Sequence, residues 1–317
     1  MMTPKIVSKT RLMFDKAIDP YRKLCLILRF KKALLQGDMP NRKIVADCYA
    51  RYALKNALIT RGLLKRPTCE TLNTWKVHFF NYETFVVLFN EIFLYNEYSF
   101  PASGPAPFII DCGSNIGMSI LYFKLLYPNA KILAFEPDDA TFKLLEKNMA
   151  GNSLKDVTIC NCALHSRDGD IDFYYDANLA GSLLMSTCKR DDTSFTDAIQ
   201  DSLSSVGMPR TCKRVKGVLL SSYITEPVDL LKMDIEGSEH VVIDELARSG
   251  KLRLIKRIVI EYHHNMRPDE PGLAGFLGVL EQNRFGYQIS ANHPNFNAGT
   301  GKFQNIIIFA YNQEMTP

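Results

Sequence analysis

Short apolar runs and amphipathic segments alternate along the C-terminal two thirds of the chain. Apolar or alternating runs predict strands at 108–110, 131–135, 157–164, 214–220, 229–234, 257–264, 287–291 and 304–311, with an added hairpin formed by 171–175 and 182–188. Helical periodicity is found from 117, over 140–149, from 239 and over 273–285. Strands that alternate with helices predict an α/β fold with a mostly parallel central sheet.

The N-terminal part of the chain has a different pattern. Residues 1–62 predict two or three helices. Apolar residues at helical spacing predict a further helix that packs on the sheet, namely Tyr82, Phe85, Val86, Phe89, Ile92 and Phe93. A segment rich in proline and glycine, 101–107, leads into the first strand. We therefore expect an N-terminal helical extension over 1–100 and an α/β domain over 101–317.

A glycine turn follows the first predicted strand. The strand ends at Asp111, and the chain then passes through Gly113 and Gly117 into a helix. Without a Cβ, the backbone can approach a ligand closely, and the first N–H groups of the helix point toward it. The spacing departs from the Gly-x-Gly-x-x-Gly of dinucleotide sites, and a carboxylate would repel a phosphate. An acid at this place suits a cationic ligand, and S-adenosylmethionine carries both an ammonium and a sulfonium group.

A second acid follows the second predicted strand. Glu136 ends the run 131–135, and Pro137 comes next. A glutamate at this position can accept hydrogen bonds from both ribose hydroxyls of a nucleoside. Asp138 or Asp139 is expected to cap the following helix. Asp111 or Glu136 alone could be an ordinary strand-end acid, but together with the glycine turn they predict a nucleoside site.

Four strings resemble the FkbM-type methyltransferases, in the same order and at similar spacing. They are Phe108-Ile-Ile-Asp-Cys-Gly-Ser-Asn-Ile-Gly117, Ala134-Phe-Glu-Pro137, Cys162-Ala-Leu-His-Ser166 and Leu230-Leu-Lys-Met-Asp-Ile-Glu-Gly-Ser-Glu239. The last is the most specific, and the resemblance runs from about Tyr82 to about Tyr311. It implies a class I (Rossmann-like) fold with a seven-stranded sheet whose last strand is antiparallel.

The resemblance also implies S-adenosylmethionine as cofactor and methylation of a hydroxyl oxygen on a saccharide, glycolipid or secondary metabolite. The cofactor-binding residues expected from it and from the turn are Asp111, Gly113, Ser114, Asn115, Gly117, Glu136, Pro137 and Ala163. Many nucleoside-binding methyltransferases place an Asp where Cys162 stands, so adenine recognition is expected from backbone groups around Ala163. Where the family commonly has Leu-Asp-Asp, this chain has Leu220-Ser-Ser222, so no role is carried over for that pair.

Further acids gather after the later strands. Asp234 and Glu236 follow one strand, and Glu261 and His263 end the next. Acids this close repel one another unless a cation lies among them, and a sulfonium, a metal ion or Lys232 could supply it. A histidine beside acids can act as a general base, and the same set could equally hold a divalent ion that acidifies a hydroxyl. We expect Asp234, Glu236, Glu261 and His263 to surround the methyl acceptor.

Charge and composition indicate which surfaces the protein could contact and where in the cell we expect it. Residues 1–66 hold sixteen Lys or Arg and four Asp, a net of +12, so the other residues carry 4 − 12 = −8. This basic region could contact an anionic surface such as lipid, nucleic acid or glycan, or form a solvated helical face. No apolar run approaches the length of a transmembrane helix, and no signal-peptide pattern is seen. The eight scattered cysteines favour reduced thiols and a cytoplasmic location.

Three other functions are compatible with parts of the sequence. A nicotinamide oxidoreductase is disfavoured by the glycine spacing. A nucleic-acid methyltransferase would use the basic region, but the chain lacks an Asn-Pro-Pro-Tyr-type string. A non-catalytic nucleoside-binding module would keep the pocket alone. Residues 189–212 are interpreted as a substrate lid and 292–302 as a hairpin turn, and no sequence pattern indicates an oligomeric state.

Overall fold

The computed structural model describes residues 20–37, 41–175, 185–187, 211–264, 272–291 and 304–315. The chain divides into two compact units. The first unit comprises Met1–Ser99, Ile116–Pro128 and Leu144–Leu154, and the second comprises Phe100–Asn115, Asn129–Lys143 and Lys155–Pro317. None of the helices in these described ranges is long and apolar enough to cross a bilayer.

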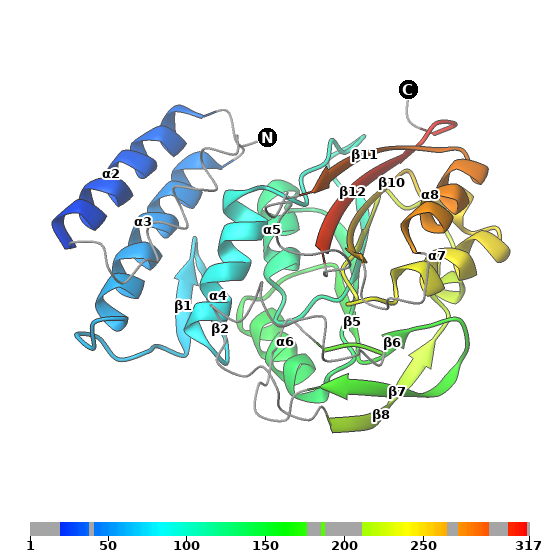
Figure 1. Ribbon diagram of the computed structural model, residues 1–317, viewed down its shortest axis with the longest axis horizontal. Helices are drawn as coiled ribbons and strands as arrows, with labels where there is room; N and C mark the ends of the chain where they lie inside the picture. The colour runs from blue at the N-terminus through cyan, green and yellow to red at the C-terminus, as the bar shows by residue number, and fades with distance from the viewer. Residues whose placement is uncertain are drawn as a thin grey trace, which may run out of the picture. The chain divides into compact units, whose positions relative to one another are not determined.

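The first unit is mainly helical (Figure 1). It contains α2 (Pro20–Gln36), α3 (Arg42–Ile59), α4 (Tyr82–Phe89), a π-helical turn η1 (Asn90–Leu94) and α5 (Met118–Leu126). The predicted aromatic helix is α4, and the rings of Phe85 and Phe89 pack edge-on against Tyr52 of α3. A hairpin of β1 (Cys69–Leu72) and β2 (Trp75–His78) was not predicted, because each strand has only four residues.

The second unit is built on a seven-stranded sheet with the order β11-β12-β10-β9-β3-β4-β5. The strands are β3 (Phe108–Cys112), β4 (Lys131–Phe135), β5 (Val157–Cys160), β9 (Leu230–Met233), β10 (Arg257–His264), β11 (Phe285–Ala291) and β12 (Gln304–Asn312). Pairing is parallel except where β12 meets β10 and β11. The predicted class I fold, with its reversed last strand, is therefore confirmed. Helix α6 (Asp139–Gly151) follows β4 and runs from the second unit into the first.

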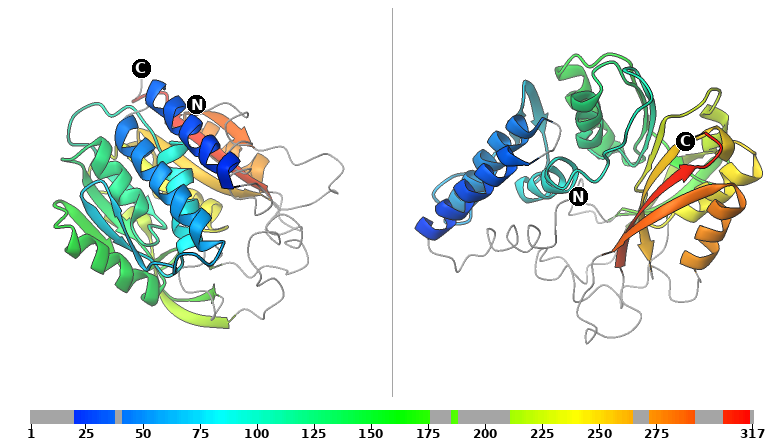
Figure 2. Two further views of the ribbon diagram at one scale, coloured as in Figure 1. Left: turned by 90° about the vertical axis from the view of Figure 1, so that its left-hand side faces the viewer. Right: turned by 90° about the horizontal axis from the view of Figure 1, so that it is seen from above.

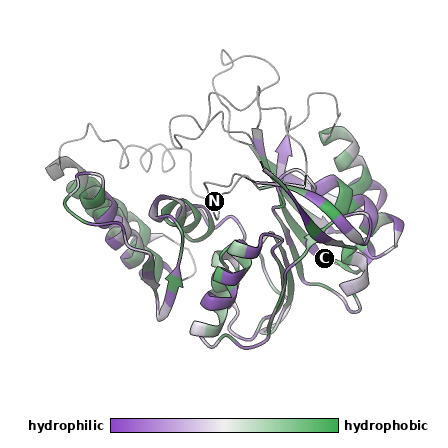
Figure 3. Cartoon of the chain, turned by 90° about the horizontal axis from the view of Figure 1, so that it is seen from below, coloured by the Kyte–Doolittle hydropathy of each residue, from purple (hydrophilic) through white to green (hydrophobic). Residues whose placement is uncertain are grey.

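Side-chain alternation gives the sheet two different faces. On one face, Ile110 and Cys112 of β3 and Leu231 and Met233 of β9 belong to a buried core. That core also includes apolar residues of α7 (Glu239–Arg248) and α8 (Leu273–Gln282), which Figure 2 shows together on one side of the sheet. Both helices carry hydrophobic and hydrophilic patches, as expected of helices that cover one face (Figure 3). Residues of opposite parity in the strands therefore point to the other face.

A separate three-stranded sheet corrects one prediction and shifts the bounds of another. The run 157–164 was expected as one strand, but it divides into β5 in the large sheet and β6 (Ala163–Leu164) in the small one. The strand expected at 214–220 is β8 (Thr211–Val218), which pairs antiparallel with β7 (Gly169–Tyr175) and parallel with β6. The predicted pairing of 171–175 with 182–188 is seen as an antiparallel bridge between Tyr174 and Ser186, while residues 182–184 and 188 lie outside the described residues. Sequence patterns identify extended segments but not their pairing.

Short helical turns complete the described chain. They are η2 (Leu220–Tyr223) and η3 (Leu252–Leu254). The predicted lid, 189–212, lies outside the described residues except for 211 and 212, which begin β8, and the predicted turn at 292–302 lies wholly outside them.

Candidate active site

The turn after β3 touches the chain that follows β9. Gly113 has a φ of 81°, and a Cβ built on it would lie 1.9 Å from the backbone oxygen of Asp234. Any other residue would therefore clash with backbone. The N–H groups of Gly113 and Ser114 both donate to the carbonyl of Phe135, at 3.0 Å. Gly113 is thus required where the glycine turn and the acidic segment meet.

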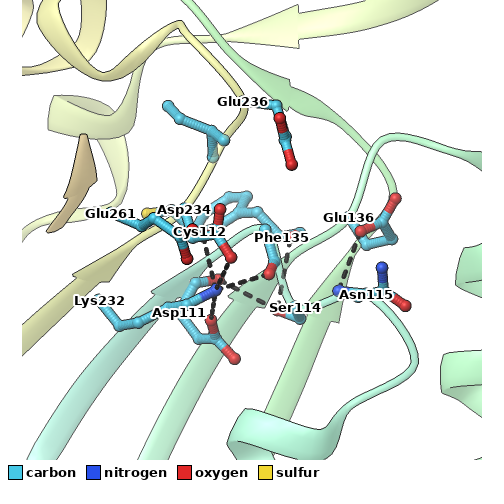
Figure 4. A network of polar contacts seen from close by, with 12 residues as sticks. Asp111, Cys112, Ser114, Asn115, Phe135, Glu136, Lys232, Asp234, Glu236 and Glu261 are labelled. Carbon is cyan, nitrogen blue, oxygen red and sulfur yellow. Dashed lines mark hydrogen bonds and ion pairs between the residues drawn. The ribbon is translucent and has the colours of Figure 1, made fainter. Parts of the chain in front are cut away.

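Glu136 lies directly beside this turn. One carboxylate oxygen accepts the N–H of Asn115 at 3.0 Å (Figure 4), and the other accepts the N–H of Asp138 at 2.9 Å. Burial, with a smaller contribution from the Asp138 carboxylate, raises the pKa of Glu136 to about 7, although the two N–H groups favour ionisation. A carboxylate has about four acceptor sites, so two remain for hydroxyl donors.

The neighbours of Glu136 include a residue that sequence reasoning missed. The side-chain amide of Asn161 donates to the carbonyls of Glu136 and Pro137, at 3.0 and 3.3 Å. Asp138 caps α6 by accepting the N–H of Thr141 at 2.9 Å, which identifies it as the cap rather than Asp139. The signal for Asn161 was only its place one residue after β5.

Two other predicted cofactor residues have clear structural positions. Ala163 is buried in β6, opposite Gly217 of β8, rather than continuing β5. Gly117 precedes α5 in the first unit with a φ of 92°, and a Cβ there would meet Leu145 and Met149 at 2.8 and 2.6 Å. The left-handed φ therefore already favours a glycine at 117, whatever binds beside it.

Asp111 and Asp234 share a buried ammonium group. Lys232 Nζ lies 3.3 Å from Asp111 Oδ1 and 3.7 Å from Asp234 Oδ2. Burial alone would lower the pKa of Lys232, but the Asp111 and Asp234 carboxylates outweigh it and raise the pKa above its ordinary value. Lys232, one of the cations that the sequence offers for these acids, thus lies between Asp111 and Asp234.

His263 lies among three further carboxylate contacts. Its Nδ1 is 2.9 Å from Glu239 Oε1, and its Nε2 is 3.4 Å from Glu236 Oε2 and 3.9 Å from Asp234 Oδ1. Burial would lower the pKa of His263, but Glu236 and Glu239 outweigh it and raise the pKa to about 10. In turn His263 outweighs burial and lowers the pKa of Glu239. With no ion bound, these carboxylates favour the protonated imidazole at neutral pH.

The loop that carries Glu236 has an unusual backbone. Glu236 has a φ of 55°, which is uncommon outside glycine, and Gly237 has a φ of 97°. Glu239 accepts the N–H of Gly237 at 3.0 Å, and the Ser186 hydroxyl donates to the Glu236 carbonyl. Glu239 thus bonds both to His263 and to this loop.

Glu261 belongs to the same face of the sheet but has another partner. Its carboxylate accepts a hydrogen bond from the side-chain amide of Asn305 in β12. The parity of β10 places Glu261 and His263 on the face opposite the α7 and α8 core, because Ile260 and Tyr262 belong to that core. The structure thus brings Asp234, Glu236 and His263 together. Glu261 lies on β10, two residues before His263.

The sheet order, the glycine turn and the strand-end acids define a class I methyltransferase that uses S-adenosylmethionine. Residues 111–289, more than half of the chain, match the profile of the methyltransferase FkbM domain. The chain therefore belongs to the FkbM family of methyltransferases.

Named relatives agree with this assignment. Methyltransferase sdnD of Sordaria araneosa is 31% identical over 191 residues, which cover 55% of this chain and 73% of that protein. The 31-O-demethyl-FK506 methyltransferase FkbM of Streptomyces tacrolimicus is 26% identical over 211 residues, covering 62% and 78%. The crystal structure of methyltransferase FkbM from Methylobacillus flagellatus KT aligns with a TM-score of 0.42 and 13% identity, covering 88% of this chain and 57% of that one.

Proposed function

We propose that the protein transfers the methyl group of S-adenosylmethionine to a hydroxyl oxygen of a saccharide, glycolipid or secondary metabolite. The observation that carries the proposal is the contact between Gly113 and the Asp234 backbone, because it joins the cofactor turn to the cluster of Asp234, Glu236 and His263. The name of the Streptomyces relative, which specifies a 31-O position, supports oxygen as the acceptor atom.

In this proposal Glu136 would accept the ribose hydroxyls, and the turn 113–115 would help to hold the cofactor. The bound cofactor would supply a methyl group on a sulfonium, whose carbon–sulfur bond would break, its electron pair neutralising the sulfonium, as the acceptor oxygen bonds to the methyl carbon in line. The acceptor hydroxyl must then lose one proton. Since His263 already carries its proton, we assign proton acceptance to the carboxylate of Asp234 or Glu236, with His263 and Glu261 holding that region.

A divalent metal ion is a second candidate for the proton step. Ligand atoms of Asp234, Glu236 and His263 lie within 4.8 Å of one another, which is compatible with shared coordination. An ion bound at Nε2 would replace the proton on that nitrogen, and Glu239 at Nδ1 fits the usual partner of a metal-binding histidine. A bound ion would lower the pKa of the acceptor hydroxyl. Activity that is lost in EDTA and restored by Mg²⁺ or Mn²⁺ would favour the ion, and unchanged activity would favour the carboxylate.

The direct test is incubation with methyl-labelled S-adenosylmethionine and a panel of saccharides, glycolipids and hydroxylated secondary metabolites, with the Asp234→Asn variant as control. We expect labelled O-methyl product from the wild type and little from the variant. Cofactor binding without transfer to any hydroxyl would instead support a nucleoside-binding module. Transfer to RNA with salt-sensitive binding would support a nucleic-acid substrate for the basic region.

The location we propose is cytoplasmic. The described cysteines, namely Cys25, Cys48, Cys69, Cys112, Cys160, Cys162 and Cys212, are free thiols. Free thiols are typical of a reducing compartment. Fractionation of cells that produce the protein would test this.

A further inference from the structure

The ammonium group of Lys232 touches both halves of the candidate site. Its Nζ donates to the carbonyl of Gly113 at 2.7 Å and to that of Cys112 at 3.3 Å. The same atom lies 3.3 Å from Asp111 and 3.7 Å from Asp234 (Figure 4). One buried cation therefore contacts the end of β3, the cofactor turn and the acid that follows β9.

Strand register explains this position. Lys232 of β9 lies opposite Asp111 of the parallel strand β3. Its neighbours Leu231 and Met233 enter the core under α7 and α8, so Lys232 and Asp234 point to the other face with Asp111. In the sequence of β9, Lys232 is only a single lysine within an apolar run, and its pairing with Asp111 becomes visible only from the register against β3.

Stability alone does not account for a lysine here. The Lys232 side chain is 2% exposed and that of Asp111 is 0% exposed. A buried ion pair of this kind often gives no more stability than apolar residues of similar volume, because both charges lose their hydration. What the ammonium supplies, and an apolar side chain cannot, is simultaneous binding to two carbonyls of the turn and two carboxylates.

We infer that Lys232 is a positioning residue that holds the Gly113 turn and Asp234 at a fixed spacing, so that a bound cofactor and the acceptor-side carboxylate stay aligned. The inference rests on the proposed function for the role of Asp234 toward the acceptor. Its effect on the turn concerns cofactor binding alone, which can be measured without an acceptor.

The experiment compares two neutralised Lys–Asp pairs in the full-length chain. In the first, Lys232→Met is combined with Asp111→Asn, which removes both charges. The matched control combines Lys256→Met with Asp229→Asn. These two residues lie just before β10 and β9, at the edge of the sheet opposite the turn, and their charged groups are 2.7 Å apart. Thermal unfolding and the affinities for S-adenosylmethionine and S-adenosylhomocysteine are measured by calorimetry for each.

We expect Lys232→Met alone to lower the melting temperature, because Asp111 then stays buried without its cation. The double variant should recover most of that loss but still bind both nucleosides at least tenfold more weakly than Asp111→Asn alone, a comparison that separates the loss of the ammonium from any direct contact of Asp111 with the cofactor. The control double variant should bind them within about twofold. Wild-type affinity in the 232/111 double variant would show that Lys232 only neutralises Asp111, and would overturn the inference. Tighter binding of S-adenosylmethionine alone would overturn it too, by showing that the ammonium mainly repels the sulfonium.

If the double variant does not fold, a measurement on the wild type still tests the inference. Hydrogen exchange should slow at the amides of 113–115 and of 235–237 together when S-adenosylmethionine is added. Slowing at 113–115 alone would show that the two segments are not coupled, which contradicts the inference. A wild type that binds the cofactor but methylates no hydroxyl compound would refute the proposed function and leave these results valid.

Discussion

Glu136 and Asp111 are buried carboxylates at the same edge of the sheet, yet they are stabilised in different ways. Glu136 is bound by the N–H groups of Asn115 and Asp138, and its pKa is raised to about 7. Asp111, one strand away, has the ammonium of Lys232 at 3.3 Å. Farther along the edge, His263 lies among Glu236, Glu239 and Asp234.

Under the proposed function, this difference matches two tasks of the second unit, namely binding of the ribose and support of the methyl-transfer step. A carboxylate held by backbone N–H groups can exchange or add neutral donors such as ribose hydroxyls with little change in charge. Carboxylates held by Lys232 and His263 have a fixed arrangement of charge, which suits a step in which a sulfonium loses its charge and a hydroxyl loses a proton. We therefore expect substitutions at Glu136 to change cofactor affinity, and those around His263 to change turnover.

The largest effect is expected from Gly113→Ala, which disturbs both regions at once. The added Cβ would lie 1.9 Å from the Asp234 oxygen, and a φ of 81° is unfavourable for alanine. We expect the free energy of unfolding to fall by about 3 kcal/mol or more, with no measurable cofactor binding by calorimetry. Gly275→Ala in α8, where a Cβ meets nothing within 4 Å, is the control and should leave both properties near wild type. Cofactor binding retained by Gly113→Ala would argue against the tight contact.

The next effect isolates the region around His263. Asp234→Asn keeps the shape of the side chain but removes a carboxylate 3.9 Å from the imidazole and 3.7 Å from Lys232. We expect kcat to fall by about 100- to 10,000-fold, as for other losses of acid–base groups, while the cofactor Kd changes by less than about threefold. Steady-state kinetics and calorimetry check the two parts. A variant with normal kcat would move the proton acceptor to Glu236 or to a metal ion.

Glu136→Gln tests the other region. The amide can accept through its oxygen but presents a donor to one of the backbone N–H groups, and it lacks the charge that strengthens hydrogen bonds from ribose. Hydrogen bonds to charged groups contribute about 1.5–3 kcal/mol, so we expect the cofactor Kd to rise by about 10- to 100-fold with kcat at saturating cofactor little changed. The exposed Glu226→Gln serves as control. An unchanged Kd would remove the ribose assignment.

Local patterns in the sequence predicted most of the large sheet and the positions of the strand-end acids, because alternation and glycine turns depend on neighbouring residues. They did not predict that Lys232 faces Asp111, since that pairing depends on the register of β9 against β3, strands far apart in the chain. Glu239 was missed as the partner of His263 because their contact depends on how α7 packs beside β10, which neighbouring residues in the sequence do not reveal. The division of 157–164 between two sheets depends on β8, which follows much later.

The smallest effect, a dependence on pH, compares the two regions in one protein. The folded-state pKa of Glu136, about 7, exceeds its ordinary value of 4.5. This carboxyl group therefore contributes stability that is full below pH 4.5 and is lost as pH rises through 7, about 3 kcal/mol in the cofactor-free protein. Because ribose hydroxyls bind the ionised form, cofactor affinity should rise about tenfold between pH 6 and pH 8, the range over which that form grows from about 9% to about 91%.

Calorimetry across this range, with Glu136→Gln as the reference, separates Glu136 from the other titrating groups. The Gln variant should show weaker binding that is nearly independent of pH, since the pKa of His263, about 10, lies above the range. A wild-type affinity that stays flat from pH 6 to pH 8 would mean that Glu136 is ionised throughout. The different ways in which Glu136 and the carboxylates near the buried cations are stabilised would then no longer explain why one affects cofactor affinity and the others affect turnover.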